Sequence, residues 1–210
     1  MSTARWHYTR KLAAILTVLG MVLALFPVAA FAQFKDVGGT LADEIKKAYE
    51  AGLVSGYSDG TFRPNENVSR AAFAKMIVLA VEQATGEELE TGSEPFSDVR
   101  PGQALYEYVV KAYKAGYIKG YPDGTFGYNK AISRMEAAAI LQRALGLPLQ
   151  AENFKDVPDN SGFAKAIGAV AAAGIMVGYG DNFKPAENLS RGQAAAVAYR
   201  ALEYLVSQQP

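Results

Sequence analysis

Three arginines stand directly after a serine, which is one of the preferred residues at a helix N-cap. They are Arg70, Arg134 and Arg191. A cation at the first position of a helix is unfavourable, because the helix dipole already places partial positive charge there. A guanidinium beside helix N–H groups is suited to hold a carboxylate or another anion, so these arginines are the first candidates for a binding site. In the alternative interpretation, each arginine pairs with a loop aspartate and pins the turn.

The arginines belong to a threefold internal repeat with nearly constant spacing. They are separated by 64 and then 57 residues, and two glycines four residues apart precede each of them. Each copy also contains a Phe-x-Asp-Val segment and a Gly-Tyr pair, and the first two copies contain Asp-Gly-Thr-Phe. Repeats of this kind are supersecondary units that bury their apolar faces only against one another. Function is therefore expected in what the three copies share.

The repeated tyrosines and aspartates are further candidates for ligand contact. The set comprises Tyr57, Tyr121, Tyr179, Asp36, Asp98 and Asp156. A tyrosine can stack on a sugar face or offer its hydroxyl, although a ring in this position also commonly packs against a neighbouring helix. The aspartates of Phe-x-Asp-Val are explained at least as well as Asx-type caps before the first helix of each copy. A second set, Asp59, Asp123 and Asp181, is assigned to ordinary turns, since the loop lacks the ligand pattern of an EF-hand.

Two helices per copy are predicted to position these residues. An apolar stripe with helical spacing precedes Gly52, Gly116 and Gly174, which are predicted as left-handed caps that end the first helix. A second helix begins at each serine-arginine pair, with capping boxes in the second and third copies. Alanine stands ten residues after each arginine, which lets the three second helices approach closely. The connectors at 84–95 and 145–153 are expected outside the bundle.

We therefore expect a mostly α fold of three helix-loop-helix repeats with short hairpin-like loops. The repeats form a pseudo-threefold trimer around a central three-helix bundle. Half of the residues are hydrophobic, which is enough for one joint core but little for three independent ones.

The N-terminus predicts export. Residues 1–32 combine a basic start, an apolar run and an Ala-Phe-Ala end, as a cleaved secretory signal peptide does. An uncleaved membrane anchor is the alternative. Cleavage leaves a mature chain from Gln33 with a net charge of −3, without the basic field expected for nucleic-acid binding. The three repeats are assigned to 33–92, 93–152 and 153–210.

Catalysis and metal chemistry find little support in the sequence. The chain has no cysteine, and its one histidine, His7, lies in the predicted signal peptide. The mature part then has no imidazole base, no histidine or cysteine metal ligand and no disulfide framework. Nothing singles out two carboxylates across one cleft, as a glycosidase requires. We expect a binding protein without a cofactor or metal, not an enzyme.

These motifs resemble three tandem S-layer homology repeats. The resemblance rests on Phe-x-Asp-Val, Gly-Tyr, Asp-Gly-Thr-Phe and Ser-Arg-x-x, the last corresponding to the family's Thr-Arg-Ala-Glu. It implies a pseudo-trimer whose inter-repeat grooves hold secondary cell wall polymer, often through a pyruvylated amino sugar. By the same resemblance, the three arginines would pair with the ketal carboxylate, and Gly56, Gly120 and Gly178 would allow close approach of the sugar. Ala72 and Gln193 depart from the motif's glutamate, which predicts weaker grooves there.

The resulting hypothesis is non-covalent anchoring of an exported protein to the bacterial cell wall or S-layer. The expected partner is an anionic glycan, with no nucleic acid and no membrane after signal cleavage. An envelope protein is the second candidate partner, which would make the chain a structural, assembly or docking module. A small secreted wall hydrolase is the remaining alternative.

Overall fold

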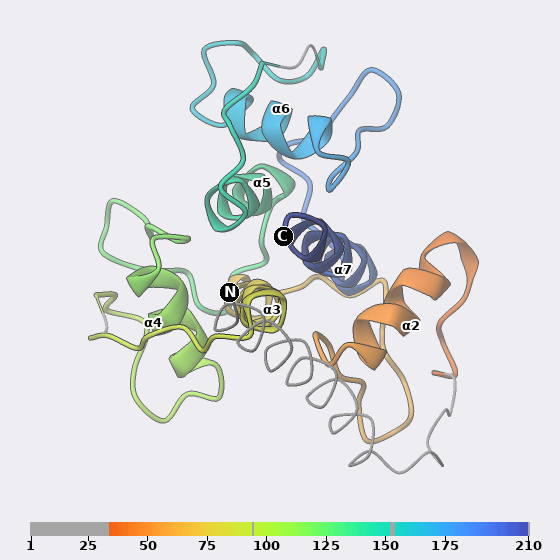
Figure 1. Ribbon diagram of the computed structural model, residues 1–210, viewed down its shortest axis with the longest axis vertical. Helices are drawn as coiled ribbons and strands as arrows, with labels where there is room; N and C mark the ends of the chain where they lie inside the picture. The colour runs from red at the N-terminus through yellow and green to blue at the C-terminus, as the bar shows by residue number, and fades with distance from the viewer. Residues whose placement is uncertain (1–33, 94, 152–153, 210) are drawn as a thin grey trace, which may run out of the picture. The chain divides into compact units, whose positions relative to one another are not determined.

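The structure is a computed structural model that describes residues 34–93, 95–151 and 154–209 (Figure 1). Its α-helices are α2 (Ala42–Glu50), α3 (Arg70–Thr85), α4 (Tyr106–Lys114), α5 (Arg134–Ala144), α6 (Ala164–Ala172) and α7 (Arg191–Ser207). A 3-10 helix, η1 (Gly39–Leu41), precedes α2. Within the described ranges, β-structure is limited to isolated bridges. The expected mostly α fold is confirmed.

The first helix of each copy ends at the predicted glycine. The backbone φ is 70° at Gly52, 78° at Gly116 and 70° at Gly174, all in the left-handed region. After α2, the N–H of Leu53 donates to the carbonyl of Ala48 at 2.9 Å, which closes a Schellman cap, and the same bond recurs after α4 and α6. Local sequence chemistry therefore sets these helix ends.

The second helices also begin where predicted. The hydroxyls of Ser69, Ser133 and Ser190 each accept a hydrogen bond from the backbone N–H three residues later. Capping boxes with Glu136 and Gln193 complete the N-termini of α5 and α7. The N-terminus of α3 has a serine cap without this reciprocal bond, because its third residue is an alanine.

The first helix of each copy packs on the second helix of another copy. Figure 1 shows α3, α5 and α7 at the centre and α2, α4 and α6 around them. The helix α4 packs on α3 and α6 packs on α5, so each first helix lies on the second helix of the preceding copy. The ring is closed by α2, which packs on α7. The central three-helix arrangement is confirmed, whereas the packing of each first helix on another copy was not predicted.

An ion pair joins the first and last helices of the ring. Oε1 of Glu44 on α2 lies 2.5 Å from Nη2 of Arg200 on α7. Nη1 of Arg200 also donates to the carbonyl of Ile175 at 3.4 Å, just after α6. Arg200 thus connects the third copy to the first.

A buried lysine holds the connector at 84–95 against the outside of α3 and α4. Lys111 on α4 is 4% exposed, and its Nζ lies 3.0 Å from Glu82, 2.7 Å from Glu88 and 3.3 Å from Glu107. Burial lowers the pKa of Lys111, but the hydrogen bonds from the three carboxylates outweigh it and the net pKa is raised. Glu88 belongs to the connector, so this cluster ties that segment to α3 and α4.

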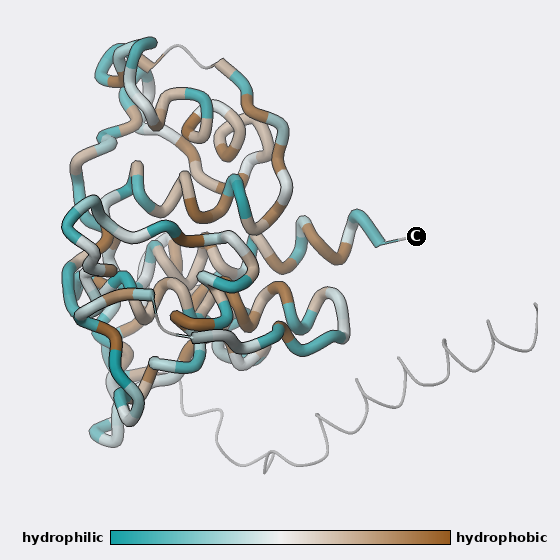
Figure 2. Tube along the Cα trace, turned by 90° about the vertical axis from the view of Figure 1, so that its left-hand side faces the viewer, coloured by the Kyte–Doolittle hydropathy of each residue, from teal (hydrophilic) through white to brown (hydrophobic). Residues whose placement is uncertain are grey.

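The three alanines that were predicted to let the central helices approach closely are not equally buried. Ala80 on α3 and Ala201 on α7 are fully buried, whereas Ala144 is the last residue of α5 and is half-buried. The helix α7 continues beyond its neighbours toward the C-terminus (Figure 2), and Val206 near its end is exposed. The small-residue contact is therefore tight for α3 and α7 and looser at the end of α5.

Some sequence predictions fall outside the described residues. These are the signal peptide at 1–32 and the mature start at Gln33. No helix in the described ranges has both the length and the apolar character needed to cross a bilayer.

We expect Ala80→Leu to destabilise the fold by about 1–3 kcal/mol, because added methylenes would force the closely packed helices apart. Ala144→Leu is the matched control and should cost clearly less, since its side chain is only half-buried. The free energy of unfolding in urea, followed by circular dichroism, measures both. Equal losses for the two variants would contradict the close approach at α3 and α7.

Candidate functional site

Each candidate arginine reaches into the loop of the next copy. Nε of Arg70 donates to the carbonyl of Phe126 at 2.8 Å, and Nε of Arg134 donates to that of Phe183 at 2.8 Å. Nε of Arg191 completes the cycle with the carbonyl of Phe62 at 2.9 Å. We call these the Arg70 site, the Arg134 site and the Arg191 site. They comprise Arg70 with Tyr121 and Phe126, Arg134 with Tyr179 and Phe183, and Arg191 with Tyr57 and Phe62.

Two of the arginines also donate from a terminal nitrogen to a carbonyl of the same loop. Nη2 of Arg134 donates to the carbonyl of Val177 at 2.8 Å, and Nη2 of Arg191 to that of Ser55 at 3.1 Å. Arg70 and Arg134 are only 5% exposed. The arginines thus pin the loops, but the acceptors are carbonyl oxygens and not the expected loop aspartates. One terminal nitrogen of each arginine has no partner among the described residues and remains for a ligand.

The helix N–H groups expected to help bind an anion are occupied. The backbone N–H of Arg70 donates to the carbonyl of Lys130 at 2.9 Å, and that of Ala71 to the carbonyl of Tyr128 at 3.3 Å. Loop carbonyls take the equivalent N–H groups at the starts of α5 and α7. This part of the sequence interpretation was wrong, because the next copy's loop fills the helix N-terminus. These helix N–H groups are therefore not available to an anion.

Each site tyrosine lies against its arginine. The guanidinium carbon is 4.6 Å from the Tyr121 ring centre in the Arg70 site, and the corresponding distances are 5.0 Å for Tyr179 and 4.9 Å for Tyr57. Tyr57 and Tyr179 remain 38% and 46% exposed, whereas Tyr121 is half-buried. The structure therefore brings the predicted arginines and tyrosines together, always from neighbouring copies.

A second cation lies on each tyrosine ring. Arg63 is 3.9 Å from the ring centre of Tyr57, Lys130 is 4.5 Å from that of Tyr121, and Lys184 is 4.9 Å from that of Tyr179. Sequence reasoning missed these cations because their spacing varies. Arg63 and Lys184 directly follow the loop phenylalanine, whereas the second copy has Gly127 there and its lysine three residues later.

The Arg70 site contains a carboxylate that the other two lack. Nη1 of Arg70 lies 3.1 Å from Oε1 of Glu136, which also accepts from the Tyr121 hydroxyl at 2.5 Å. Burial raises the pKa of Glu136, but its hydrogen bonds and Arg70 outweigh this and hold the pKa below its usual value. Burial and the bond to Glu136 raise the pKa of Tyr121.

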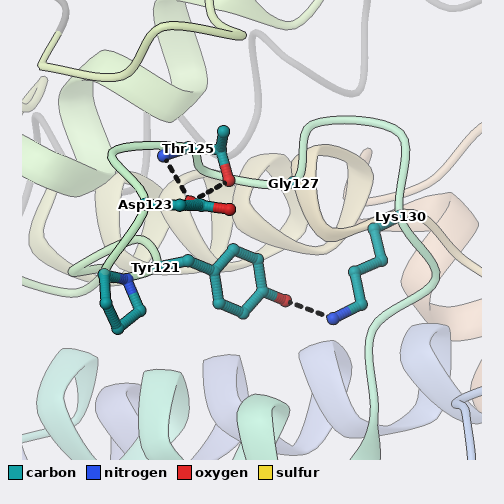
Figure 3. A pocket seen from close by; sticks show the side chains of 6 residues that line it. Tyr121, Asp123, Thr125, Gly127 and Lys130 are labelled. Atoms are coloured by element: carbon teal, nitrogen blue, oxygen red, sulfur yellow. Dashed lines mark hydrogen bonds between the residues drawn. The ribbon is translucent and has the colours of Figure 1, made fainter.

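A pocket beside this site is lined by Tyr121, Pro122, Asp123, Thr125, Gly127 and Lys130 (Figure 3). Nζ of Lys130 donates to the Tyr121 hydroxyl at 3.0 Å, and the two side chains point toward each other in Figure 3. The Asp123 carboxylate instead accepts from the N–H and hydroxyl of Thr125 at 2.9 and 2.7 Å. Asp123 is therefore a turn residue, as predicted, and Asp59 makes the same bonds to Thr61.

The aspartates of Phe-x-Asp-Val accept hydrogen bonds from backbone N–H groups of the tyrosine loops, and we call them the aspartate braces. Oδ1 of Asp98 accepts from the N–H of Phe126 at 2.6 Å, and Oδ2 accepts from Gly127 and Tyr128 at 2.8 Å each. Asp36 and Asp156 accept equivalent bonds from their own loops. The interpretation as local caps of the first helix was wrong, because these helices start without a side-chain cap.

These hydrogen bonds lower the pKa of two of the aspartate braces. Backbone hydrogen bonds hold the pKa of Asp36 below its usual range. Burial raises the pKa of Asp98, but the three N–H bonds outweigh it and the net pKa is lowered. The aspartate braces thus place a negative charge against the loop backbone without contacting the site arginines.

Two of the loop glycines are required by packing. A β-carbon at Gly120 would lie 2.2 Å from Cε1 of Phe96, and one at Gly178 would lie 2.4 Å from Cε1 of Phe154. Gly56 is half-buried in the first loop. Their proposed role in admitting a sugar stays a prediction. In the described ranges, no group of three or more acidic, histidine or cysteine side chains is arranged to hold a metal ion.

Comparison with known proteins identifies the repeat. The family model described as S-layer homology domain matches residues 33–74, 95–138 and 153–195, which is more than half of the chain. The chain belongs to the S-layer homology domain family. Each matched segment contains one aspartate brace, one tyrosine loop and one serine-arginine pair of the three sites.

Several relatives are much longer surface proteins or enzymes. The surface-layer 125 kDa protein of Lysinibacillus sphaericus is 29% identical over 201 residues, which cover 91% of this chain and 17% of that protein. The cellulosome-anchoring protein of Acetivibrio thermocellus is 35% identical over 134 residues, 60% of this chain and 30% of that protein. The amylopullulanase of Thermoanaerobacterium thermosulfurigenes is 35% identical over 181 residues, 81% of this chain and 9% of that enzyme. The chain spans less than a third of each relative's length.

These findings indicate where this S-layer homology protein is located and what kind of module it contains. Its family and its surface-layer relatives make it a secreted protein of the bacterial cell surface. Most of the chain consists of a binding module, and the relatives support a role in anchoring to the cell wall.

We expect Asp98→Asn to destabilise the fold by about 1–3 kcal/mol at neutral pH, because an amide cannot accept three backbone N–H bonds as a carboxylate does. The folded-state pKa is below the unfolded one, so the carboxylate stabilises fully above the unfolded pKa and loses this effect as the pH falls through the folded value. The gap between parent and variant should therefore shrink below about pH 4.

Urea unfolding at several pH values measures this difference. Asp159→Asn is the control, since Asp159 is exposed, and it should change little at any pH. A gap for Asp98→Asn that stays constant down to pH 3 would show that the carboxylate charge does not brace the loop.

Proposed function

We propose that this chain attaches non-covalently to the bacterial cell wall by binding an acidic secondary cell wall polymer at its arginine sites. The expected group is the carboxylate of a pyruvate ketal on an amino sugar. In this proposal, residues 1–32 direct export and are removed, and the repeats 33–92, 93–152 and 153–210 together build the sites. The chain acts as a binding protein, not as an enzyme.

The observation that carries the proposal is the repeated pairing of a buried or half-buried guanidinium with a tyrosine and a second cation. Each site arginine keeps one terminal nitrogen without a partner among the described residues. No side-chain nitrogen or oxygen in those ranges is both buried and unpartnered, so the remaining nitrogen of Arg134 is within reach of solvent. A carboxylate placed there gains a charge-assisted hydrogen bond in a site of low dielectric constant.

The tyrosine ring suits the rest of the ligand. Its apolar face can pack on a sugar ring while its edge and hydroxyl stay in contact with water. A charge-assisted contact of about 1.5–3 kcal/mol per site is weak alone. Several such sites on one repeating polymer bind much more tightly than one, because the second contact forms at high effective concentration.

Changing the ligand tests the proposal without disturbing the protein. Because the arginines also hold the loops, their replacement would mix loss of binding with loss of structure. We therefore expect the parent chain to be retained on purified cell walls, and to be released when mild acid has removed the pyruvate ketals. Added salt should also weaken retention, since the contact is between charges.

Several outcomes would overturn the proposal. Equal retention before and after ketal removal would exclude the carboxylate contact. Loss of retention on protease-treated walls would favour an envelope protein as the partner. A fall in the turbidity of a wall suspension over time would indicate a hydrolase.

A further inference from the structure

The residue directly before the loop glycine differs in chemistry among the three sites. It is Ser55 at the Arg191 site, Lys119 at the Arg70 site and Val177 at the Arg134 site. The residue that precedes it is apolar and buried in all three loops, whereas this residue is exposed in all three. A serine or a lysine is ordinary at a position that faces water, but a valine is not. The third copy therefore places an isopropyl group where the other two copies place a polar one.

Val177 belongs to an exposed apolar surface beside a buried guanidinium. Val177 is 56% exposed, and Tyr179, two residues later in the same loop, is 46% exposed. Single exposed apolar side chains are common on protein surfaces and need no function. Val177 differs from such a residue, because its own carbonyl accepts the hydrogen bond from Nη2 of Arg134 at 2.8 Å.

This hydrogen bond keeps the Val177 side chain near the guanidinium. Standard bond lengths place a carbonyl oxygen about 3 Å from the β-carbon of its own residue, so the β-carbon of Val177 lies within about 6 Å of Nη2. Nη1 of Arg134 has no hydrogen bond among the described residues. The Arg134 site thus combines a donor for a carboxylate with apolar surface close beside it.

The backbone around Val177 is held in place by its neighbours. Gly178 lies so close to Phe154 that a β-carbon there would be 2.4 Å from Cε1 of the ring. The N–H of Tyr179 donates to the carbonyl of Asn182 at 2.7 Å. A side chain on a fixed backbone loses little freedom when a ligand packs against it, so the ordering cost of binding is small.

A pyruvate ketal carries the two groups that match this surface. Its ketal carbon bears both a carboxylate and a methyl group. When the carboxylate accepts from Nη1, the methyl group lies within about 6 Å of the guanidinium, which is also the range of the Val177 side chain. Burial of the methyl group against valine is favourable, whereas the hydroxyl of Ser55 or the ammonium of Lys119 stays hydrated at the equivalent position.

We infer that Val177 makes the Arg134 site selective for an acidic sugar whose carboxylate stands beside a methyl group. This inference rests on the proposed function. The Arg70 and Arg191 sites bind an acidic group with little preference for the methyl, because their equivalent residues are polar. The three sites then share the arginine but differ in ligand specificity.

The protein side of the test removes the valine without removing the carbonyl. Val177→Ser introduces the residue of the first copy, where the carbonyl of Ser55 accepts the same bond from Nη2 of Arg191 at 3.1 Å. The loop should therefore keep its shape. Val206→Ser is the matched control, since Val206 is 54% exposed and lies at the opposite end of α7 from Arg191.

The ligand side of the test removes one methyl group at a time. The reference ligand is an N-acetylated amino sugar with a pyruvate ketal. Its glyoxylate acetal has hydrogen in place of the ketal methyl, and its N-formyl analogue has hydrogen in place of the acetyl methyl. The amide NMR signal of Gly178 is present in all variants and reports binding at the Arg134 site during titration with each ligand.

We expect the Arg134 site of the parent chain to bind the pyruvate ketal about fourfold more tightly than the glyoxylate acetal, as burial of one methyl group predicts. This ratio should fall to about one in Val177→Ser, because the apolar partner of the methyl is gone, and it should not change in Val206→Ser. A nuclear Overhauser effect between the ketal methyl and the methyl groups of Val177 is expected in the parent complex.

The comparison of ligands on the parent chain needs no substitution, so a folding defect cannot hide the answer. Equal affinity of the parent for ketal and acetal, or the same ratio in parent and Val177→Ser, would overturn the inference and leave the carboxylate contact standing. A preference that depends on the acetyl methyl instead would also overturn it. If no ligand shifts the Gly178 signal while cell walls still retain the chain, the inference is wrong and the proposed function stands. If the walls do not retain the chain either, both fall.

Discussion

The hydrogen bond from an arginine of one copy to a loop carbonyl of the next is the contact on which the structure depends. It holds the start of each second helix against a neighbour's loop and occurs three times, the last time between Arg191 and Phe62. Since the first helix of each copy also packs on the preceding copy, no copy contains its own complete core. Stability is then shared around the ring, and a loop can keep its shape only when its neighbour is in place.

Helix ends were predictable from sequence because their determinants are local. A glycine in the left-handed conformation or a serine with a glutamate three residues later acts within one turn, so position alone reveals it. The pairing between copies was not predictable in this way. A repeat shows which residues are equivalent but not which copy supplies the partner, and a carbonyl acceptor leaves no trace in the sequence because every residue has one. The braces at Asp36, Asp98 and Asp156 were missed for the same reason, since their partners are backbone N–H groups of a distant loop.

The second cations show how a site can be conserved in space while its spacing changes. Arg63 and Lys184 have φ of 60°, a left-handed backbone that costs about 1–2 kcal/mol for a residue with a side chain. The second copy has Gly127 at this point, without that cost, and Lys130 covers the tyrosine instead. Contacts of the cations with the tyrosine rings and nearby carboxylates offset part of the strain. A search for fixed spacing therefore finds the arginine and the tyrosine but not their third component.

The residue beside each arginine links helix stability to site charge. Glu136 completes a capping box, which stabilises the start of α5, and at the same time it neutralises Arg70. Gln193 keeps the cap of α7 without placing a carboxylate beside Arg134, whereas Ala72 gives up the reciprocal bond altogether. The helix α3 can lack that bond because α4, α5 and α7 all pack on it, and tertiary contacts contribute more to helix stability than a cap does.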